Sequence, residues 1–226
     1  EPLTSLNPVF TIGEQIAEPL RVHLRLPEPE VHRRCIQLLA DVGLDSPADR
    51  LADYPHRLSG GQRQRVMIAM ALACEPELII ADEPTTALDV TIQAQILELL
   101  AGLQDRLKLS VILITHDLGV IAQICHRVAV MYAGKVVEVG LAEDIFERPV
   151  HPYTQGLLRA TPRPDEVSER MVAIEGLPPN LIAPPQGCAF ASRCSCAGES
   201  CCMQPEMTSY EEDRMVSCWC AGQQQP

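Results

Sequence analysis

A pair of glycines stands directly before a predicted helix, at a place where an anion could bind. The segment Leu58-Ser59-Gly60-Gly61-Gln62 precedes a run of helix-forming residues that extends to Leu72. A helix N-terminus presents N–H groups without partners and the positive end of a dipole, and glycines let phosphate oxygens approach the backbone closely. Taken alone, the Ser-Gly-Gly segment is more typical of an N-capped helix after a flexible turn.

Two carboxylates follow a short apolar segment that is predicted to be a strand. Asp82 and Glu83 come directly after Leu78-Ile79-Ile80-Ala81. The carboxyl edge of a sheet is where α/β folds bind ligands, and a carboxylate such as Asp82 can hold Mg²⁺ through its oxygens. Glu83 is placed to orient or deprotonate an attacking water. An acidic turn at a strand end is the ordinary alternative.

A second apolar strand, residues 111–114, leads into Thr115-His116-Asp117. His116 would lie at the same edge as the two carboxylates and could meet a phosphate, although a lone histidine there is more often structural. Between the two strands, Ala87-Leu88-Asp89 forms a polar turn before a helix predicted over residues 90–107.

Cysteines are concentrated near the C-terminus. Of ten cysteines, seven lie between Cys188 and Cys220, while Cys35, Cys74 and Cys125 are scattered singly. Such clustering favours a metal or cluster site in a reducing compartment over a framework of disulfides. A tail of free thiols remains the alternative.

Three zones must position these residues. Residues 1–74 carry apolar residues at helical spacing and are predicted to be mainly helical. Residues 75–147 alternate between apolar strands and helices, and the Ala133-Gly134 turn predicts a hairpin. Apolar strands without alternation indicate a sheet covered on both faces, hence an α/β core. From about Pro149 the many prolines predict mostly loop and extended linker.

Composition excludes some classes of function. The chain has 226 residues, 46% of them hydrophobic, which is enough for a buried core. Its net charge of −12 argues against a large nucleic-acid surface. No apolar run approaches the roughly 18 residues that span a bilayer, and no signal peptide is recognisable. The polar start without a methionine predicts that the chain is an internal piece of a longer one.

In order and spacing, these motifs resemble the ABC ATPase family over roughly residues 1–147. The resemblance implies a partial P-loop NTPase-like ABC ATPase core of α/β class. The helical subdomain and signature helix would span residues 1–74, the C-terminal part of the RecA-like core 75–147, and a loop-rich, cysteine-containing extension 148–226. Leu58–Gln62 matches the signature motif, Asp82 the Walker B aspartate, Glu83 the catalytic glutamate, Asp89 the D-loop aspartate and His116 the switch histidine.

The family works as a head-to-tail dimer with ATP and Mg²⁺ between two subunits. The resemblance implies that Ser59, Gly60, Gly61 and Gln62 bind the nucleotide of a second ABC ATPase subunit. Asp82, Glu83, Asp89 and His116 would serve ATP hydrolysis, with Asp82 holding Mg²⁺ through water. No Gly-x-x-x-x-Gly-Lys-Ser/Thr segment is present, and the family's Q-loop glutamine would precede Glu1. We therefore expect these 226 residues alone to be inactive.

The segments Glu143-Asp144-Ile145-Phe146 and His151-Pro152-Tyr153-Thr154-Gln155 resemble the extension of oligopeptide/dipeptide importer ATPases. This implies a peripheral subunit at the cytoplasmic face of the cell membrane that energises peptide import. Its partners would be two permease subunits and, indirectly, an extracytoplasmic peptide-binding protein, with no nucleic acid. Import of nickel or glutathione, a soluble ABC ATPase in translation or DNA repair, and a non-enzymatic metal-binding module are the alternatives.

The same importer branch carries four cysteines that resemble a [4Fe–4S] site. On that resemblance the ligands are Cys188, Cys194, Cys201 and Cys218, with Zn²⁺ as the alternative metal. Cys202 competes with Cys201 as third ligand. Cys196, Cys202 and Cys220 depart from the family pattern.

Overall fold

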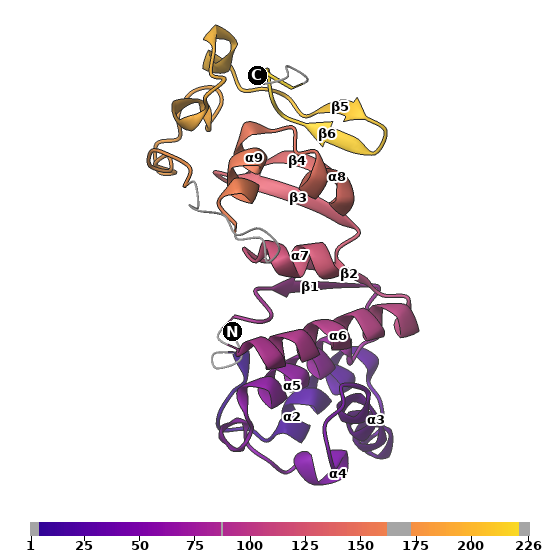
Figure 1. Ribbon diagram of the computed structural model, residues 1–226. Coiled ribbons are helices and arrows are strands. Elements are labelled where there is room, and N and C mark those ends of the chain that lie inside the picture. Colours follow the sequence, from indigo (N-terminus) through magenta and orange to yellow (C-terminus); the bar gives the residue numbers. More distant parts are fainter. Residues whose placement is uncertain (1–4, 87, 162–172, 222–226) are drawn as a thin grey trace. The chain divides into compact units, whose positions relative to one another are not determined.

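The computed structural model describes residues 5–86, 88–161 and 173–221 (Figure 1). The chain divides into two compact units, residues 1–116 and 117–226. Each unit has its own hydrophobic core, and each is described by itself below.

The N-terminal unit is mainly helical, as the sequence predicts. Its elements in chain order are α2 (Ile12–Pro19), the π-helix η1 (Leu20–Leu24), α3 (Glu28–Asp41), α4 (Pro47–Arg50), the 3₁₀-helix η2 (Pro55–Arg57), α5 (Gly60–Leu72), β1 (Leu78–Asp82), α6 (Val90–Leu107) and β2 (Ser110–Ile114). Ile12, Ile16 and Leu20 are fully buried, which confirms the helical face predicted for them. They join a core to which α3, α5 and α6 also contribute.

Side chains cap the starts of the helices α2, α5 and α6 by accepting hydrogen bonds from backbone N–H groups. At α2, the Thr11 hydroxyl accepts from the Glu14 N–H at 3.2 Å, and the Glu14 carboxylate accepts from the Thr11 N–H at 2.8 Å. Such a capping box satisfies two of the N–H groups that a helix start leaves unpaired. A second capping box starts α5, and Asp89 caps α6. Two of the predicted motifs are therefore also helix-start signals.

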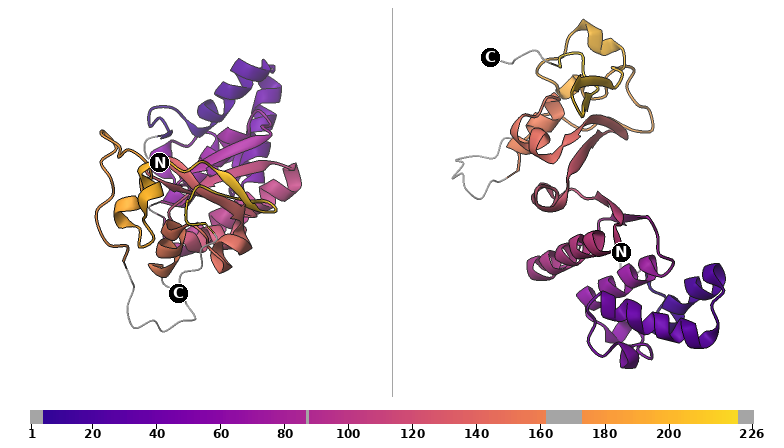
Figure 2. Two further views of the ribbon diagram at one scale, coloured as in Figure 1. Left: turned by 90° about the horizontal axis from the view of Figure 1, so that it is seen from above. Right: turned by 90° about the vertical axis from the view of Figure 1, so that its right-hand side faces the viewer.

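Strands β1 and β2 form a parallel pair in which Leu78 lies opposite Ser110 and Asp82 opposite Ile114. Ile79 and Val111 point toward the helical core, where α6 runs alongside the pair (Figures 1 and 2). On the other face Ile80 is 63% and Ile114 49% exposed. Within the described residues of this unit, the helices pack against one face of the pair.

The C-terminal unit is built on an antiparallel sheet with the strand order β3-β4-β6-β5. Its elements are α7 (Leu118–Ile124), β3 (Arg127–Tyr132), β4 (Lys135–Leu141), α8 (Ala142–Glu147), α9 (Pro152–Arg159), the 3₁₀-helices η3 (Ala191–Arg193) and η4 (Glu199–Cys202), β5 (Thr208–Glu211) and β6 (Arg214–Val216). Ala133 and Gly134 have φ of 50° and 77°, the left-handed geometry of a tight hairpin turn. The predicted hairpin is confirmed.

The expectation that the region after Pro149 is mostly loop is only partly right. Pro152 occupies the first turn of α9, where the missing N–H of proline costs nothing. Further on, β6 pairs with β4 through Glu138 opposite Val216 and Val139 opposite Met215, so the end of the chain extends the sheet. Pro162 and Pro164 lie outside the described residues.

None of the helices in the described ranges combines the length and apolar character that a membrane span needs.

Candidate functional site

The predicted anion-binding segment lies at the start of α5, with Ser59 as the N-cap. The Ser59 hydroxyl oxygen accepts from the Gln62 N–H at 3.3 Å, and the Gln62 side-chain oxygen accepts from the Ser59 N–H at 3.0 Å. A serine hydroxyl that accepts as a cap still has its own hydrogen to donate. The segment can therefore hold its helix start and still offer donors to an anion.

The two glycines of this segment also serve packing, a role that the sequence analysis missed. A Cβ on Gly61 would lie 2.6 Å from Cγ2 of Ile92, and one on Gly60 would lie 3.3 Å from Cδ2 of Leu88. The start of α5 therefore lies directly against the turn that begins α6. Because Asp89 caps α6 by accepting from the Ile92 N–H at 3.0 Å, this contact joins the segment around Gly61 to that around Asp89.

Glu83 and His116 are brought together at the carboxyl ends of β1 and β2. The Nδ1 atom of His116 lies 2.7 Å from Oε1 of Glu83, and the Thr86 hydroxyl donates to Oε2 of Glu83 at 2.7 Å. The Glu83 N–H donates to the carbonyl of Ile114 at 2.9 Å, which fastens it to the end of β2. The sequence analysis predicted that Glu83 and His116 share this edge, but it did not single out Thr86.

The electrostatics of this pair suit a base. The hydrogen bond to His116 and then that to Thr86 hold the pKa of Glu83 below its ordinary value. Glu83 is therefore ionised at neutral pH, and since a carboxylate only accepts, the Nδ1 atom of His116 carries the shared hydrogen. The Glu83 side chain is 37% and that of His116 83% exposed, so both can be reached from solvent.

The backbone at Glu83 has an unusual conformation. Its φ of 48° lies in the left-handed region, which residues other than glycine seldom adopt. Such conformations persist where the surrounding structure imposes them, and they concentrate at functional sites. Asp82, the last residue of β1, is exposed next to it and offers carboxylate oxygens for Mg²⁺.

In the C-terminal unit, the backbone brings two of the four predicted cysteine ligands side by side. The Cys188 N–H donates to the carbonyl of Cys201 at 3.0 Å. Gly187 has a φ of 83°, and a Cβ there would lie 2.4 Å from the carbonyl oxygen of Cys201. Only glycine fits this close approach. The Cys220 N–H in turn donates to the sulfur of Cys218 at 3.4 Å.

None of the ten cysteines forms a disulfide. Burial raises the pKa of Cys194 to about 11 and that of Cys218 to about 12, and the thiols of Cys220 and Cys188 act on both in the same direction. Within the ranges that the structure describes, no group of three or more His, Cys, Asp or Glu side chains is arranged to hold a metal.

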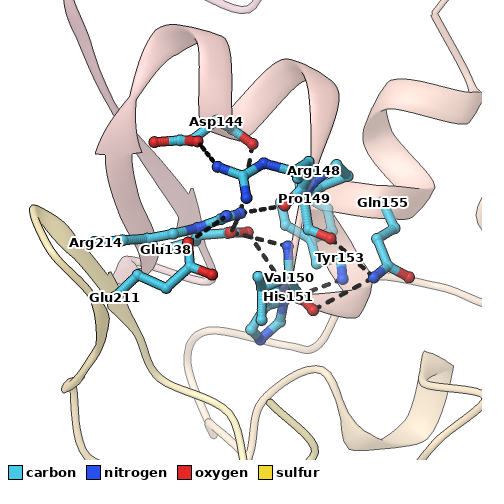
Figure 3. A network of polar contacts seen from close by, with 10 residues as sticks. All are labelled: Glu138, Asp144, Arg148, Pro149, Val150, His151, Tyr153, Gln155, Glu211 and Arg214. Carbon is cyan, nitrogen blue, oxygen red and sulfur yellow. Dashed lines mark hydrogen bonds and ion pairs between the residues drawn. The ribbon is translucent and has the colours of Figure 1, made fainter. Parts of the chain in front are cut away.

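A buried network of charged groups fastens the C-terminal hairpin to the rest of its unit (Figure 3). Glu138 on β4 accepts from Arg214 on β6 at 2.7 Å, and the N–H groups of Val150 and His151 donate to it at 2.9 and 3.0 Å. Arg214 also donates to the carbonyl of Arg148. The Glu138 and Arg214 side chains are 0% and 2% exposed. No sequence pattern predicts this pair, whose members are 76 positions apart.

His151, part of the segment that resembles the importer extension, has a structural role here. It caps α9, with its Nδ1 atom accepting from the Tyr153 N–H at 3.0 Å. Burial lowers the pKa of His151 to about 4, against the opposing effect of Glu138. The ring is therefore neutral at physiological pH, packed beside Phe190.

Comparison with known proteins identifies the family. A family model described as "ABC transporter" matches residues 3–86, and one described as "Oligopeptide/dipeptide transporter, C-terminal region" matches residues 137–201. The dipeptide transport ATP-binding protein DppD of Bacillus subtilis is 50% identical over 224 residues, which cover 99% of this chain and 67% of that protein. The chain belongs to the ABC transporter family.

Two further members of the ABC transporter family show a similar degree of identity. The oligopeptide transport ATP-binding protein OppD of Haemophilus influenzae is 48% identical over 99% of this chain and 69% of its own length. OppD of Escherichia coli is 49% identical over 97% of this chain and 65% of its own length. The chain thus spans about two thirds of the length of these relatives.

Solved ABC structures share the fold. CbiO1 of Clostridium perfringens, part of the CbiONQ ABC transporter complex, aligns with a TM-score of 0.58 and 31% identity over 66% of this chain and 58% of its own. An ATP-binding cassette solved as a dimer with ADP and Pi aligns with a TM-score of 0.54 and 33% identity over 61% of this chain and 59% of its own. The predicted α/β ABC ATPase core is confirmed.

Proposed function

We propose that this chain is the signature-bearing part of an ATP-hydrolysing subunit that energises the import of dipeptides or oligopeptides. The observation that carries the hydrolytic role is the Glu83–His116 pair at the carboxyl ends of two parallel strands. The printed names of the DppD and OppD relatives, and the match of residues 137–201 to the oligopeptide/dipeptide region, support peptides as the transported class.

The proposed roles follow from the geometry of each residue. Glu83, ionised and exposed, orients the attacking water and accepts its proton. His116 holds the Glu83 carboxylate in place and meets the terminal phosphate from the same edge of the sheet. Asp82 offers oxygen ligands for Mg²⁺, the ion that neutralises charge developing on the phosphates in this reaction class.

The remaining site residues act across a subunit interface in this proposal. Ser59, Gly60, Gly61 and Gln62 bind the nucleotide of a second ABC ATPase subunit through the helix start of α5. Asp89 belongs to the turn that packs against them. Two membrane-embedded permease subunits hold the pair at the cytoplasmic face of the cell membrane, and an extracytoplasmic peptide-binding protein delivers the cargo. The division into residues 1–74, 75–147 and 148–226 is part of the same proposal.

The test of the hydrolytic role is Glu83→Gln in the intact subunit assembled with its partners. The substitution keeps the shape of the side chain but removes the base, so we expect ATP binding to persist and turnover to fall by about a thousandfold or more. Glu98→Gln is the matched control, because Glu98 is exposed in the middle of α6 and has no role in the proposed site. Turnover of the Glu83→Gln subunit near that of the wild type would contradict the proposal.

We further propose that Cys188, Cys194, Cys201 and Cys218 hold a [4Fe–4S] cluster, with Zn²⁺ as the alternative. The backbone approach of Cys188 to Cys201 and the N–H···S contact to Cys218 support a thiolate site. Anaerobic purification followed by iron and zinc analysis tests it. Cys194→Ser should lose the metal, whereas Cys74→Ser in the other unit should retain it. A colourless protein without iron or zinc would exclude both metals.

A further inference from the structure

We propose that Thr86 is a positioning residue for Glu83, holding one carboxylate oxygen while His116 holds the other. This inference rests on the proposed hydrolytic function and assigns a role to a side chain outside the predicted site. The Thr86 hydroxyl lies 2.7 Å from Oε2 of Glu83, as close as Nδ1 of His116 lies to Oε1.

The main chain of Glu83 is fixed before its side chain is considered. Its N–H donates to the carbonyl of Ile114 at 2.9 Å, and its carbonyl accepts from the Thr86 N–H at 3.2 Å. Between Glu83 and Thr86, Pro84 and Thr85 are buried, and proline has a nearly fixed φ. The turn that carries the Thr86 hydroxyl is therefore anchored independently of that hydroxyl.

Two donors fix the carboxylate in a way that one donor cannot. The terminal torsion of a glutamate has a broad energy well, so a carboxylate held through one oxygen can still rotate. With Oε1 held by His116 and Oε2 by Thr86, the plane of the group is defined. Each oxygen keeps a second lone pair for water. Thr86 therefore sets the direction from which Glu83 can accept a proton.

The energetics distinguish this role from an ordinary structural one. Thr86 is exposed and the Glu83 side chain is 37% exposed. A hydrogen bond in contact with water adds little to stability, because water replaces it when it is lost. Orientation of a catalytic group is far more sensitive, since a small misplacement changes the rate by a large factor. Removal of the hydroxyl should thus affect turnover and leave stability almost unchanged.

The experiment compares three variants of the intact subunit in its assembled transporter. Thr86→Val keeps the shape and removes the hydroxyl, Thr86→Ser keeps the hydroxyl, and Thr91→Val makes the same change at an exposed position on α6. We expect kcat of Thr86→Val to fall by about tenfold with KM for ATP within about twofold. The kcat of Thr86→Ser should lie within about threefold of the wild-type value, and the kcat of Thr91→Val should equal the wild-type value.

Wild-type kcat in Thr86→Val would overturn the inference. A Thr86→Ser subunit as slow as Thr86→Val would overturn it as well, because keeping the hydroxyl would then not preserve turnover. Glu83→Gln, measured in the same preparation, separates this inference from the function on which it rests. If Glu83→Gln abolishes turnover and Thr86→Val does not reduce it, only the role of Thr86 fails. If Glu83→Gln retains turnover, the hydrolytic proposal fails, and the role of Thr86 fails with it.

Discussion

Each unit of the molecule contains a glutamate paired with a basic side chain, and the two pairs differ in their access to water. Glu138 and Arg214 in the C-terminal unit are 0% and 2% exposed, while Glu83 and His116 in the N-terminal unit are 37% and 83% exposed. The heavy-atom distance is 2.7 Å in both pairs. The contacts are thus alike in length and opposite in environment.

The environment decides what each pair can do. A charge taken out of water is costly unless its partners are all present, so a buried pair makes the surrounding structure depend on both members. Glu138 has the Arg214 guanidinium and two backbone N–H groups as donors (Figure 3). Glu83 stays in reach of solvent, where its pairing adds little to stability but leaves its oxygens available to a substrate.

The largest stability effect should follow from breaking the buried pair. In Glu138→Ala, Arg214 would lose its buried partner and retain the longer, 3.8 Å contact with Glu211. We expect the free energy of unfolding of the C-terminal unit to fall by about 3–5 kcal/mol. The only tryptophan, Trp219, lies in this unit, so its fluorescence during urea denaturation reports that transition. Glu147→Ala removes an exposed carboxylate at the end of α8 as the control. Equal midpoints for the two variants would show that Glu138 is not structural.

Protonation of His151 should make the stability of the C-terminal unit depend on pH. Because burial lowers its pKa to about 4, the folded protein binds fewer protons than the unfolded chain between pH 6.5 and 4. Stability should therefore fall as the pH is lowered through this window, by about 3 kcal/mol in total. His151→Asn keeps an oxygen to cap α9 but cannot titrate there. If the wild type and His151→Asn lost the same stability over this pH window, the loss would come from the titration of other groups.

The Glu138–Arg214 pair also shows which features of the fold can be predicted from the sequence and which cannot. The helix over residues 90–107 was predicted with the bounds that the structure shows, because apolar spacing and capping residues are local signals. The placement of Asp82, Glu83 and His116 at strand ends was equally local. The partnership of Glu138 with Arg214 was not, since it joins β4 to a strand far along the chain and follows from no spacing rule.

The same limit applies to the role of Gly61. Glycine in the Ser-Gly-Gly segment was predicted to admit a phosphate, whereas its contact with Ile92 required knowledge of where α6 lies. Long-range packing decided both the Glu138–Arg214 pair and the contact of Gly61 with Ile92, which the sequence analysis missed.

A smaller stability effect is expected from Gly61→Ala in the N-terminal unit. The added methyl group would lie 2.6 Å from Cγ2 of Ile92, so either this side chain must move or the two helix starts must separate, at a cost of about 1–3 kcal/mol. Gly102→Ala adds the same group on α6 where no atom lies within 4 Å, and it should be neutral or stabilising. Far-UV circular dichroism during denaturation measures both. If Gly61→Ala were as stable as Gly102→Ala, the two helix starts would not be in the tight contact described.

The smallest stability effect is expected at the exposed pair itself. The pKa of Glu83 is lowered in the folded state, so its contribution to stability is present above the ordinary glutamate pKa and is lost as the pH falls through the folded value. Solvent screening keeps this contribution below about 1 kcal/mol at neutral pH. Glu83→Gln should therefore unfold almost like the wild type at pH 7, and the difference should vanish in acid. A loss as large as that of Glu138→Ala would mean that Glu83 holds the fold together, and the contrast between the two pairs would fail.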